Sequence, residues 1–379
     1  MSRICQRLGM VYYVDSAPLL TLYVTIRGLN LAERAGALVE MALMYASMAL
    51  ATGLIPRFGL ARHYARLALE AGLRTTDSAA RGWVHELRGS LAFGFGEWES
   101  ARTELEQALA LFENLGARRP ADECRALLGA AAGAHGEFAR GLRLWEQVVV
   151  NSRRRHDVNA TAWGLTGQAD NLLSLGRVEE AIARAAEAIA LREAYPLQVS
   201  EMVRTSTSPV MALARLRRDE VDLARPELAV GAELVARPPT APFTYAGHTA
   251  VAGAYLAVIE ITDRTERRAV MKAARRALRH LGAFARVFPI GRPRFLLYRG
   301  LLDWADGHPA RARRSWEGAL AAAGQLDMPY EQALALRELG RRAPLAIERD
   351  ERLARAAELF RRLGAAADLA ETEALARAA

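Results

Sequence analysis

The stretch Trp83–Gly116, WVHELRGSLAFGFGEWESARTELEQALALFENLG, decides which fold is predicted for this chain. It reads as a helix, a tight turn and a second helix, with Gly96 marking the turn. In the second segment, Ala101, Leu105 and Ala108 follow the i, i+4, i+7 spacing of one helix face. The stretch therefore predicts a helical hairpin with an apolar face on its second helix.

This hairpin recurs at a step of 40 residues. The turn glycine Gly96 is followed by Gly136 and then by Gly176. Small residues recur at the same step in both helices, a pattern that indicates a repeat protein. In the first helix they are Gly9, Ala49, Gly89, Gly129 and Ala169, and the second-helix series is Thr21, Ala61, Ala101, Gly141 and Ala181.

The small residues have a packing reason. Two helices approach to about 8–10 Å only where their contact side chains permit it, and glycine or alanine lets the backbones close. Larger residues such as Leu105 and Trp145 then fill the space towards the next hairpin. Because neither helix can bury its face alone, neighbouring hairpins must stack. We predict an all-α fold, an α–α superhelix (solenoid) of about eight hairpins with a period of about 40 residues.

The spacing loosens after residue 181. The next second-helix alanine is Ala224, and the proline-rich stretch that follows cannot be helical. Beyond it we expect a hairpin over 244–281 whose close contact falls at either Ala269 or Ala273. These features predict N-terminal repeats over 1–236 (five to six hairpins), a proline-rich break over 237–243, and C-terminal repeats with a cap over 244–379.

Composition bounds the class of protein. The chain has 379 residues, a net charge of +8 and 51% hydrophobic residues, which predicts a large buried core. Its two cysteines, Cys5 and Cys124, exclude a disulfide framework and a zinc module with several Cys ligands. Met1–Tyr13 lacks the pattern of a signal peptide. The uncharged stretches Met41–Ile55 and Pro238–Ile259 are too short or too broken to span a bilayer. We expect a cytoplasmic protein with no membrane segment.

No motif for catalysis is present. Lys272 is the only lysine, and the G-x-x-x-x-G-K-[ST] loop is absent, which argues against Walker-type nucleotide hydrolysis. Cys124 lies among apolar residues, so we expect a buried, inert thiol rather than a nucleophile. His135 and His308 flank turn glycines and are expected to be exposed. We therefore predict a protein that is not an enzyme, with no catalytic, cofactor-binding or metal-binding residues.

Arginine clusters are spread along the chain rather than gathered on one stripe. Arg153–Arg155 and Arg275–Arg276 are examples, and nearby acidic residues can pair with them. Nucleic-acid binding requires such residues on one surface with stacking aromatics. We interpret these clusters as a solvated outer face and do not predict a nucleic-acid partner.

The pattern of Gly89, Gly96, Ala101 and Ala108 resembles the tetratricopeptide repeat (TPR), whose helix pairs recur at about 34 residues. Leu8-Gly9 and Tyr12 in the first unit match its Leu-Gly…Tyr signature. The 40-residue step departs from that length and resembles a longer variety found in large bacterial signalling proteins.

Four segments more narrowly resemble the C-terminal repeat region of bacterial class III adenylate/guanylate cyclases that also carry an AAA-type ATPase module. They are Leu22–Glu33, Trp163–Asn171, Phe288–Pro293 and Met328–Glu331. The resemblance implies that cyclase and ATPase modules lie upstream of such repeats, and this chain contains neither. Because the first helix begins almost at Ser2 without a polar cap, we expect the N-terminal end to dock on an upstream domain or a second copy.

A partner is expected on the concave face, which the first helices of stacked hairpins line. Large aromatics in a groove can anchor a peptide or a partner helix, although packing against the next hairpin is an open alternative. The residues expected to face the groove are Trp83, Glu86, Phe93, Trp163, Thr166, Asp170, Arg294, Leu297 and Trp304.

The sequence thus predicts a non-enzymatic scaffold or regulatory module of bacterial signal transduction that holds a protein or peptide partner. Two alternatives stay open. One is the C-terminal regulatory fragment of a cyclase/AAA-ATPase protein, and the other is a ligand-sensing repeat domain of a transcription regulator.

Overall fold

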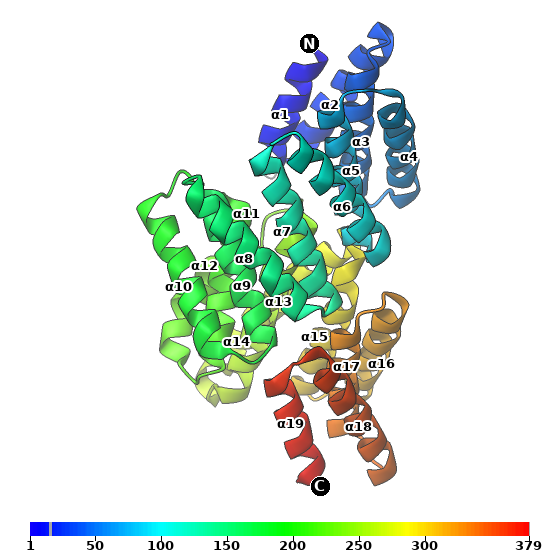
Figure 1. The fold of residues 1–379 in the computed structure, drawn as a ribbon. Helices are drawn as coiled ribbons and strands as arrows, with labels where there is room; N and C mark the ends of the chain where they lie inside the picture. The colour runs from blue at the N-terminus through cyan, green and yellow to red at the C-terminus, as the bar shows by residue number, and fades with distance from the viewer. Residues whose placement is uncertain (15–16, 379) are drawn as a thin grey trace.

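The computed structural model describes residues 1–14 and 17–378. These residues form nineteen α-helices and two 3-10 turns, without a β-strand among them (Figure 1). The all-α superhelix predicted from the repeats is confirmed. The described residues make nine helical hairpins and one final helix, against the approximate expectation of eight.

Each hairpin pairs an odd-numbered first helix with an even-numbered second helix. The pairs are α1 (Ser2–Val14) with α2 (Pro18–Ala35), α3 (Leu38–Leu54) with α4 (Phe58–Arg74), α5 (Ser78–Phe95) with α6 (Trp98–Asn114), α7 (Arg118–His135) with α8 (Phe138–Arg154), α9 (Val158–Ser174) with α10 (Val178–Ala194), α11 (Glu201–Leu216) with α12 (Val221–Leu234), α13 (Tyr245–Ile261) with α14 (Arg264–Val287), α15 (Arg292–Ala305) with α16 (Pro309–Gln325), and α17 (Pro329–Arg341) with α18 (Ala346–Leu363). The last helix, α19 (Ala366–Arg377), packs on α18.

The predicted turn glycines end the first helices. Gly96 has φ of 75° and Gly136 has φ of 102°, in the left-handed region that glycine adopts without strain. The backbone N–H of Gly96 donates to the carbonyls of Ala92 and Phe93, which caps the last turn of α5. Because the second helix starts two residues later, the two helices of each such hairpin must lie antiparallel.

The small first-helix residues provide the close contacts expected of them. A Cβ added at Gly89 would lie 2.6 Å from Cγ of Leu105, and one at Gly129 would lie 2.9 Å from Cε2 of Trp145. Leu105 and Trp145 are both fully buried. The large second-helix side chain therefore rests directly on the glycine of its own first helix.

Successive turns of the superhelix contact each other, which brings together segments far apart in the sequence. The turns after α5, α7 and α9 contact the C-terminal hairpins and α19 (Figure 1). Trp98 Nε1 donates to the Leu326 carbonyl at 2.5 Å, and the ring of His135 stacks on Trp98 at 5.0 Å. His135 is therefore half-buried, and the expectation that it is an exposed turn residue was wrong. His308 is exposed as predicted.

The proline-rich segment interrupts the helices without separating the stack. Residues 237–241 are not helical, and Pro242–Thr244 forms a 3-10 turn. Directly beyond it, α13 packs against α11, and a Cβ added at Gly247 would lie 2.1 Å from the Thr205 carbonyl oxygen. The division into 1–236 and 244–379 stays a prediction, because the first helices stack across the segment.

The second helix after this segment packs in a register that was not expected. Ala269 is exposed and Ala273 is half-buried, whereas Ala274 and Ala277 are fully buried against the core. α14 is 24 residues long and its turn contains no glycine, so the 40-residue pattern had no marker to follow there.

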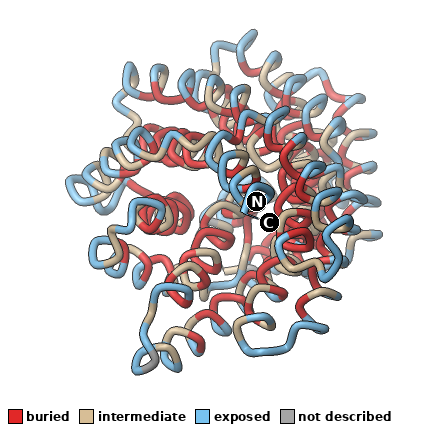
Figure 2. The backbone as a smooth tube through the Cα atoms, turned by 90° about the horizontal axis from the view of Figure 1, so that it is seen from below, coloured by how far each residue is buried: buried red, intermediate tan, exposed pale blue. Residues whose placement is uncertain are grey.

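Seen along its length, the chain arranges its helices around a central axis, with buried residues on the facing sides of neighbouring helices (Figure 2). The two uncharged stretches considered for membrane insertion lie mainly in α3 and α13. Among the described helices, none combines the length and apolar character needed to cross a bilayer.

Candidate functional site

The first helices line an internal space that consists of three adjoining cavities, which we call the upper chamber, the central cavity and the lower chamber, and together the lumen. The upper chamber and the central cavity share Trp163 and Phe243 as walls. The central cavity and the lower chamber share Arg217, Arg294 and Tyr330. The three cavities are therefore neighbours along one path through the superhelix.

The upper chamber is the largest of the three, with a cavity volume of about 680 Å³. Its walls come from α1, α3, α5, α7, α9 and α11, from Val148 of α8, from Phe243, and from the segment 196–200. Aromatic and aliphatic side chains such as Trp83, Leu50 and Leu127 alternate there with acidic ones. The acidic wall residues are Glu86, Asp122, Glu123, Asp157 and Glu201.

Two of these carboxylates differ in how their charge is balanced. Asp122 is held by Arg125 at 2.7 Å and by Arg155. Glu86 is buried, and its Oε2 has no hydrogen-bond partner among the described residues. Burial, and then the nearby charge of Glu123, raise the pKa of Glu86 well above its usual value. Glu123 and Asp157 face Arg119, and Glu201 pairs with Arg237. Glu86 is thus the acid of the upper chamber that the described residues leave without a partner.

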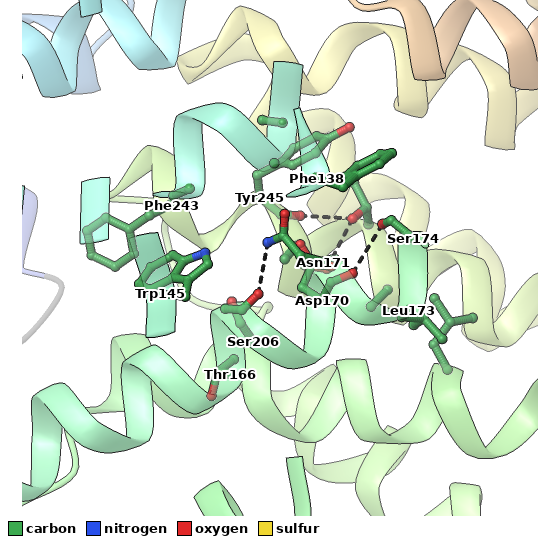
Figure 3. Close-up of a pocket in the computed structure, with 18 of the residues that line it drawn as sticks. Phe138, Trp145, Thr166, Asp170, Asn171, Leu173, Ser174, Ser206, Phe243 and Tyr245 are labelled. Atoms are coloured by element: carbon green, nitrogen blue, oxygen red, sulfur yellow. Dashed lines mark hydrogen bonds between the residues drawn. The ribbon is translucent and has the colours of Figure 1, made fainter. Parts of the chain in front are cut away.

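The central cavity is narrow, with a volume of about 90 Å³, and aromatic rings form its walls (Figure 3). Trp163 lies edge-on to Trp145 at 5.6 Å and packs on Phe243 at 4.8 Å. Phe138 meets Tyr330 edge-on at 5.1 Å on another wall. These rings come from four different elements, α8, α9, the 3-10 turn Pro242–Thr244 and α17, so the cavity exists only in the assembled superhelix.

Asp170 and Asn171 bring polar groups into this aromatic setting from α9 (Figure 3). The Asp170 carboxylate forms no ion pair or hydrogen bond with another described side chain. Burial raises the pKa of Asp170 to about 6, although Arg294 opposes that effect. The carboxyl is therefore mostly ionised at neutral pH while lacking a cationic partner.

Arg294 is already occupied. It donates two hydrogen bonds of 2.6 Å to the Glu331 carboxylate, which also accepts one of 2.7 Å from Tyr245. This bidentate pair is nearly buried, with Arg294 12% and Glu331 3% exposed. Such geometry satisfies both charges internally.

The lower chamber is lined by arginines, most of which are matched to acids. Its volume is about 560 Å³. Arg337 contacts Asp368 and Glu371, each at 2.9 Å, and Tyr330 donates to Asp368 at 2.9 Å. Burial raises the pKa of Asp368, but Arg217 and Arg337 outweigh it and hold that pKa below its usual value.

The residues expected to face the groove all line this lumen. Trp83 and Glu86 line the upper chamber, and Trp163 lies between it and the central cavity. Phe93, Thr166 and Asp170 line the central cavity, Arg294 lies between it and the lower chamber, and Leu297 and Trp304 line the lower chamber. Phe93 and Leu297 are almost completely buried, so these two also belong to the core.

Sequence reasoning missed several lining residues. Phe243 lies in the proline-rich segment, and Trp145 was assigned to the core alone. Glu331 and Asn171 lie within segments that carry the cyclase-type resemblance, Met328–Glu331 and Trp163–Asn171. The sequence pattern could not predict that these two segments line the same cavity, because they are more than 150 residues apart in the sequence.

Two features bear on chemistry: the metal-ligating residue types and the thiol of Cys124. Among residues 1–14 and 17–378, no group of three or more His, Cys, Asp or Glu side chains is placed to hold a metal ion. Cys124 is fully buried, and burial raises the pKa of its thiol, as expected for an inert cysteine.

Comparison with known proteins gives a fold without a family. No protein-family model matches the chain, and no curated protein matches it in sequence. The apo form of RapI has a similar structure, with a TM-score of 0.56, 10% identity, and coverage of 75% of this chain and 98% of RapI.

Two further Rap structures give the same result. The Rap conjugation gene regulator of plasmid pLS20, solved with the Phr* peptide, has a TM-score of 0.54 at 10% identity and covers 86% of this chain and 95% of its own. A Rap protein complexed with competence and sporulation factor has a TM-score of 0.54 at 10% identity, covering 86% of this chain and 98% of that one. The chain is similar to these proteins in fold, and that fold is a superhelix of TPR-like hairpins.

Proposed function

We propose that this chain is a non-enzymatic binding module that holds an extended segment of a peptide or protein partner in its lumen. The observation that carries the proposal is the upper chamber. Its volume falls in the range of about 300–1,000 Å³ that is typical of ligand sites. Its mixed aromatic, aliphatic and acidic walls suit a segment with apolar anchors and basic residues.

The charge pattern supports a basic rather than an acidic segment. Acidic residues outnumber arginines on the wall itself, and the arginines that pair with Asp122 and Glu201 lie outside it. Glu86 has an unpartnered carboxylate oxygen, and a buried group of this kind favours a ligand that supplies a donor. Two of the similar Rap structures were solved with a peptide or with competence and sporulation factor, which is consistent with a peptide ligand.

Selection of random peptides displayed on phage against the immobilised full chain tests this function. Leu50 lines the upper chamber on α3 and is not part of the packed core. Leu50→Arg places a long cationic side chain into the chamber, whereas the matched control Leu73→Arg changes an exposed residue of α4. We expect selected peptides to be rich in Arg or Lys and apolar residues.

The selected peptides should lose at least tenfold in affinity against Leu50→Arg and keep their affinity for Leu73→Arg. Fluorescence anisotropy measures both, and circular dichroism shows whether each variant is folded. Failure to select any peptide, or equal binding by the two variants, would remove the proposed function.

We further predict that this module acts in bacterial signal transduction, as the cyclase/ATPase resemblance of its sequence implies. The similar structures named above include no cyclase or ATPase. A cyclase–ATPase reading frame immediately upstream in the genome would favour the regulatory-fragment alternative over a stand-alone scaffold, and a transcription-regulator reading frame would favour the ligand-sensing alternative.

The first hairpin supports the expectation of a docking end. Its helices expose many large apolar side chains: Ile4, Leu8, Val11, Leu19, Leu20, Tyr23 and Ile26. Ile4, Leu8 and Val11 follow the spacing of one face of α1, and clustered exposed apolar side chains are typical of interfaces. Light scattering of the purified chain tests whether a second copy covers this face. A monodisperse monomer with an ordered first hairpin would remove the idea of self-association.

A further inference from the structure

We propose that the central cavity is a site for an organic cation, an ammonium or guanidinium group, which pairs with the Asp170 carboxylate inside the aromatic wall. This inference rests on the proposed function, since the cation reaches the cavity through the lumen. It names the chemistry that the narrowest part of the lumen recognises.

The first observation is the charge balance of the cavity. Its two arginines are matched elsewhere: Arg294 is held by Glu331 at 2.6 Å, and Arg217 lies in the field of Asp368. Asp170 has no such partner among the described residues. A carboxylate in a low-dielectric setting is costly unless a cation or several donors meet it. The occupant that removes this cost carries a positive charge.

The second observation is a set of unused polar atoms around the same cavity. Asn171 Oδ1 is buried without a hydrogen-bond partner, and the residue is 2% exposed. Trp145 Nε1 is also unpartnered, but it is a donor and does not receive a cation. Asn171 Nδ2 donates to the Gly167 carbonyl at 2.8 Å, which leaves the amide oxygen as the free acceptor. Asp170 and Asn171 together therefore offer acceptors to an N–H donor (Figure 3).

The aromatic wall gives the third observation. Trp163, Phe243, Phe138 and Tyr330 line the cavity with ring faces and edges. A cation near aromatic faces is attracted by their negative quadrupole, most strongly where water is excluded. The open volume of about 90 Å³ holds several waters or the end of one long side chain, and it excludes a folded segment. The occupant is thus the head of an amine or of a basic side chain.

The test titrates the full chain with butylammonium chloride, and with 1-butanol as the neutral match, by ligand-observed NMR. Asp170→Asn keeps the shape of the side chain and removes its charge. Asp350→Asn is the matched control on the exposed face of α18. We expect butylammonium to bind wild type and Asp350→Asn alike, and Asp170→Asn to weaken it at least tenfold. Asp170→Glu should retain part of the affinity.

A peptide arm separates the two sources of such a cation. The probe is acetyl-Gly-Leu-Ser-Arg-Ser-Leu-Gly-amide, compared with the same peptide carrying citrulline in place of arginine. Tighter binding of the arginine peptide than of butylammonium, lost in Asp170→Asn, identifies a basic side chain as the occupant. Binding of butylammonium alone identifies a free amine and retains the site while weakening the peptide function.

The inference is overturned if butylammonium binds no better than 1-butanol, or if Asp170→Asn leaves its affinity unchanged. Peptides that bind the lumen equally with arginine and citrulline would leave the proposed function in place and remove the cation site. The two failures are therefore distinguishable.

Discussion

Two aspartates of the lumen differ in their partners. The carboxylate of Asp368 in the lower chamber is hydrogen-bonded and ion-paired, whereas among the described residues that of Asp170 in the central cavity is not. Asp368 accepts hydrogen bonds from Tyr330 and Arg337, and its pKa lies below the usual value. Asp170 has no partner among the described side chains, and its pKa is raised to about 6. The Asp368 carboxylate therefore stabilises the fold. The unpaired Asp170 carboxylate destabilises it, and a cationic ligand would offset that cost.

The difference extends to the two ends of the lumen. At the C-terminal end, arginines and acids are paired, as in Arg337 with Asp368 and Arg342 with Glu338. At the N-terminal end, most acids are paired as well, as in Asp122 with Arg125, but Glu86 keeps an unpartnered buried oxygen. The unpartnered oxygen of Glu86 is the feature of the N-terminal end that is consistent with binding.

The largest effect is expected from Asp368→Asn. Removing this buried charge leaves Arg217 without its counter-charge and Arg337 with only the exposed Glu371, which should lower the free energy of unfolding by about 3–5 kcal/mol. Because the folded pKa of Asp368 is depressed, its stabilisation is present above the unfolded pKa near 4 and is lost as the pH falls below it. Urea unfolding of wild type and variant at pH 7 and at pH 3 measures the difference, which should shrink at the lower pH.

A smaller effect of opposite sign is expected from Asp170→Asn. Its folded pKa of about 6 lies above the usual value of 3.8, and a difference of one pKa unit corresponds to about 1.4 kcal/mol. The folded state binds the extra proton between these values, so wild-type stability falls as the pH rises from about 4 to 6. The variant should be about 1–3 kcal/mol more stable than wild type at pH 7 and equal to it at pH 4.

Urea unfolding across this pH range, with Asp350→Asn as control, measures that gain. A destabilised Asp170→Asn would mean that the carboxylate has a structural partner in solution, and the contrast between the two aspartates would disappear.

The smallest effect is expected from Glu371→Gln, which sharpens the comparison. Glu371 shares Arg337 with Asp368 at the same 2.9 Å, but its side chain is 53% exposed against 5% for Asp368. Solvent-exposed ion pairs contribute about 0–1 kcal/mol. Thermal unfolding should therefore change little, and a loss as large as that of Asp368→Asn would show that burial is not what separates the two acids.

The sequence alone determined the repeat and its close contacts. The 40-residue recurrence of glycine and alanine predicts which residues touch within a hairpin, because those contacts join positions about 16 residues apart, as for Gly89 with Leu105 and Gly129 with Trp145. It also placed every candidate groove residue on a first helix, where periodicity assigns the inner face. These are local relations, and the pattern of neighbouring residues is sufficient to specify them.

Only the tertiary structure decided how the superhelix closes and which charges meet inside it. The bond from Trp98 to the Leu326 carbonyl, and the cavity shared by Asp170 and Glu331, depend on a small rotation at each hairpin that accumulates along the stack. No single repeat encodes that sum. A slight change in every step would move the C-terminal hairpins away from the turns of α5 and α7, and the central cavity would lose its wall from α17.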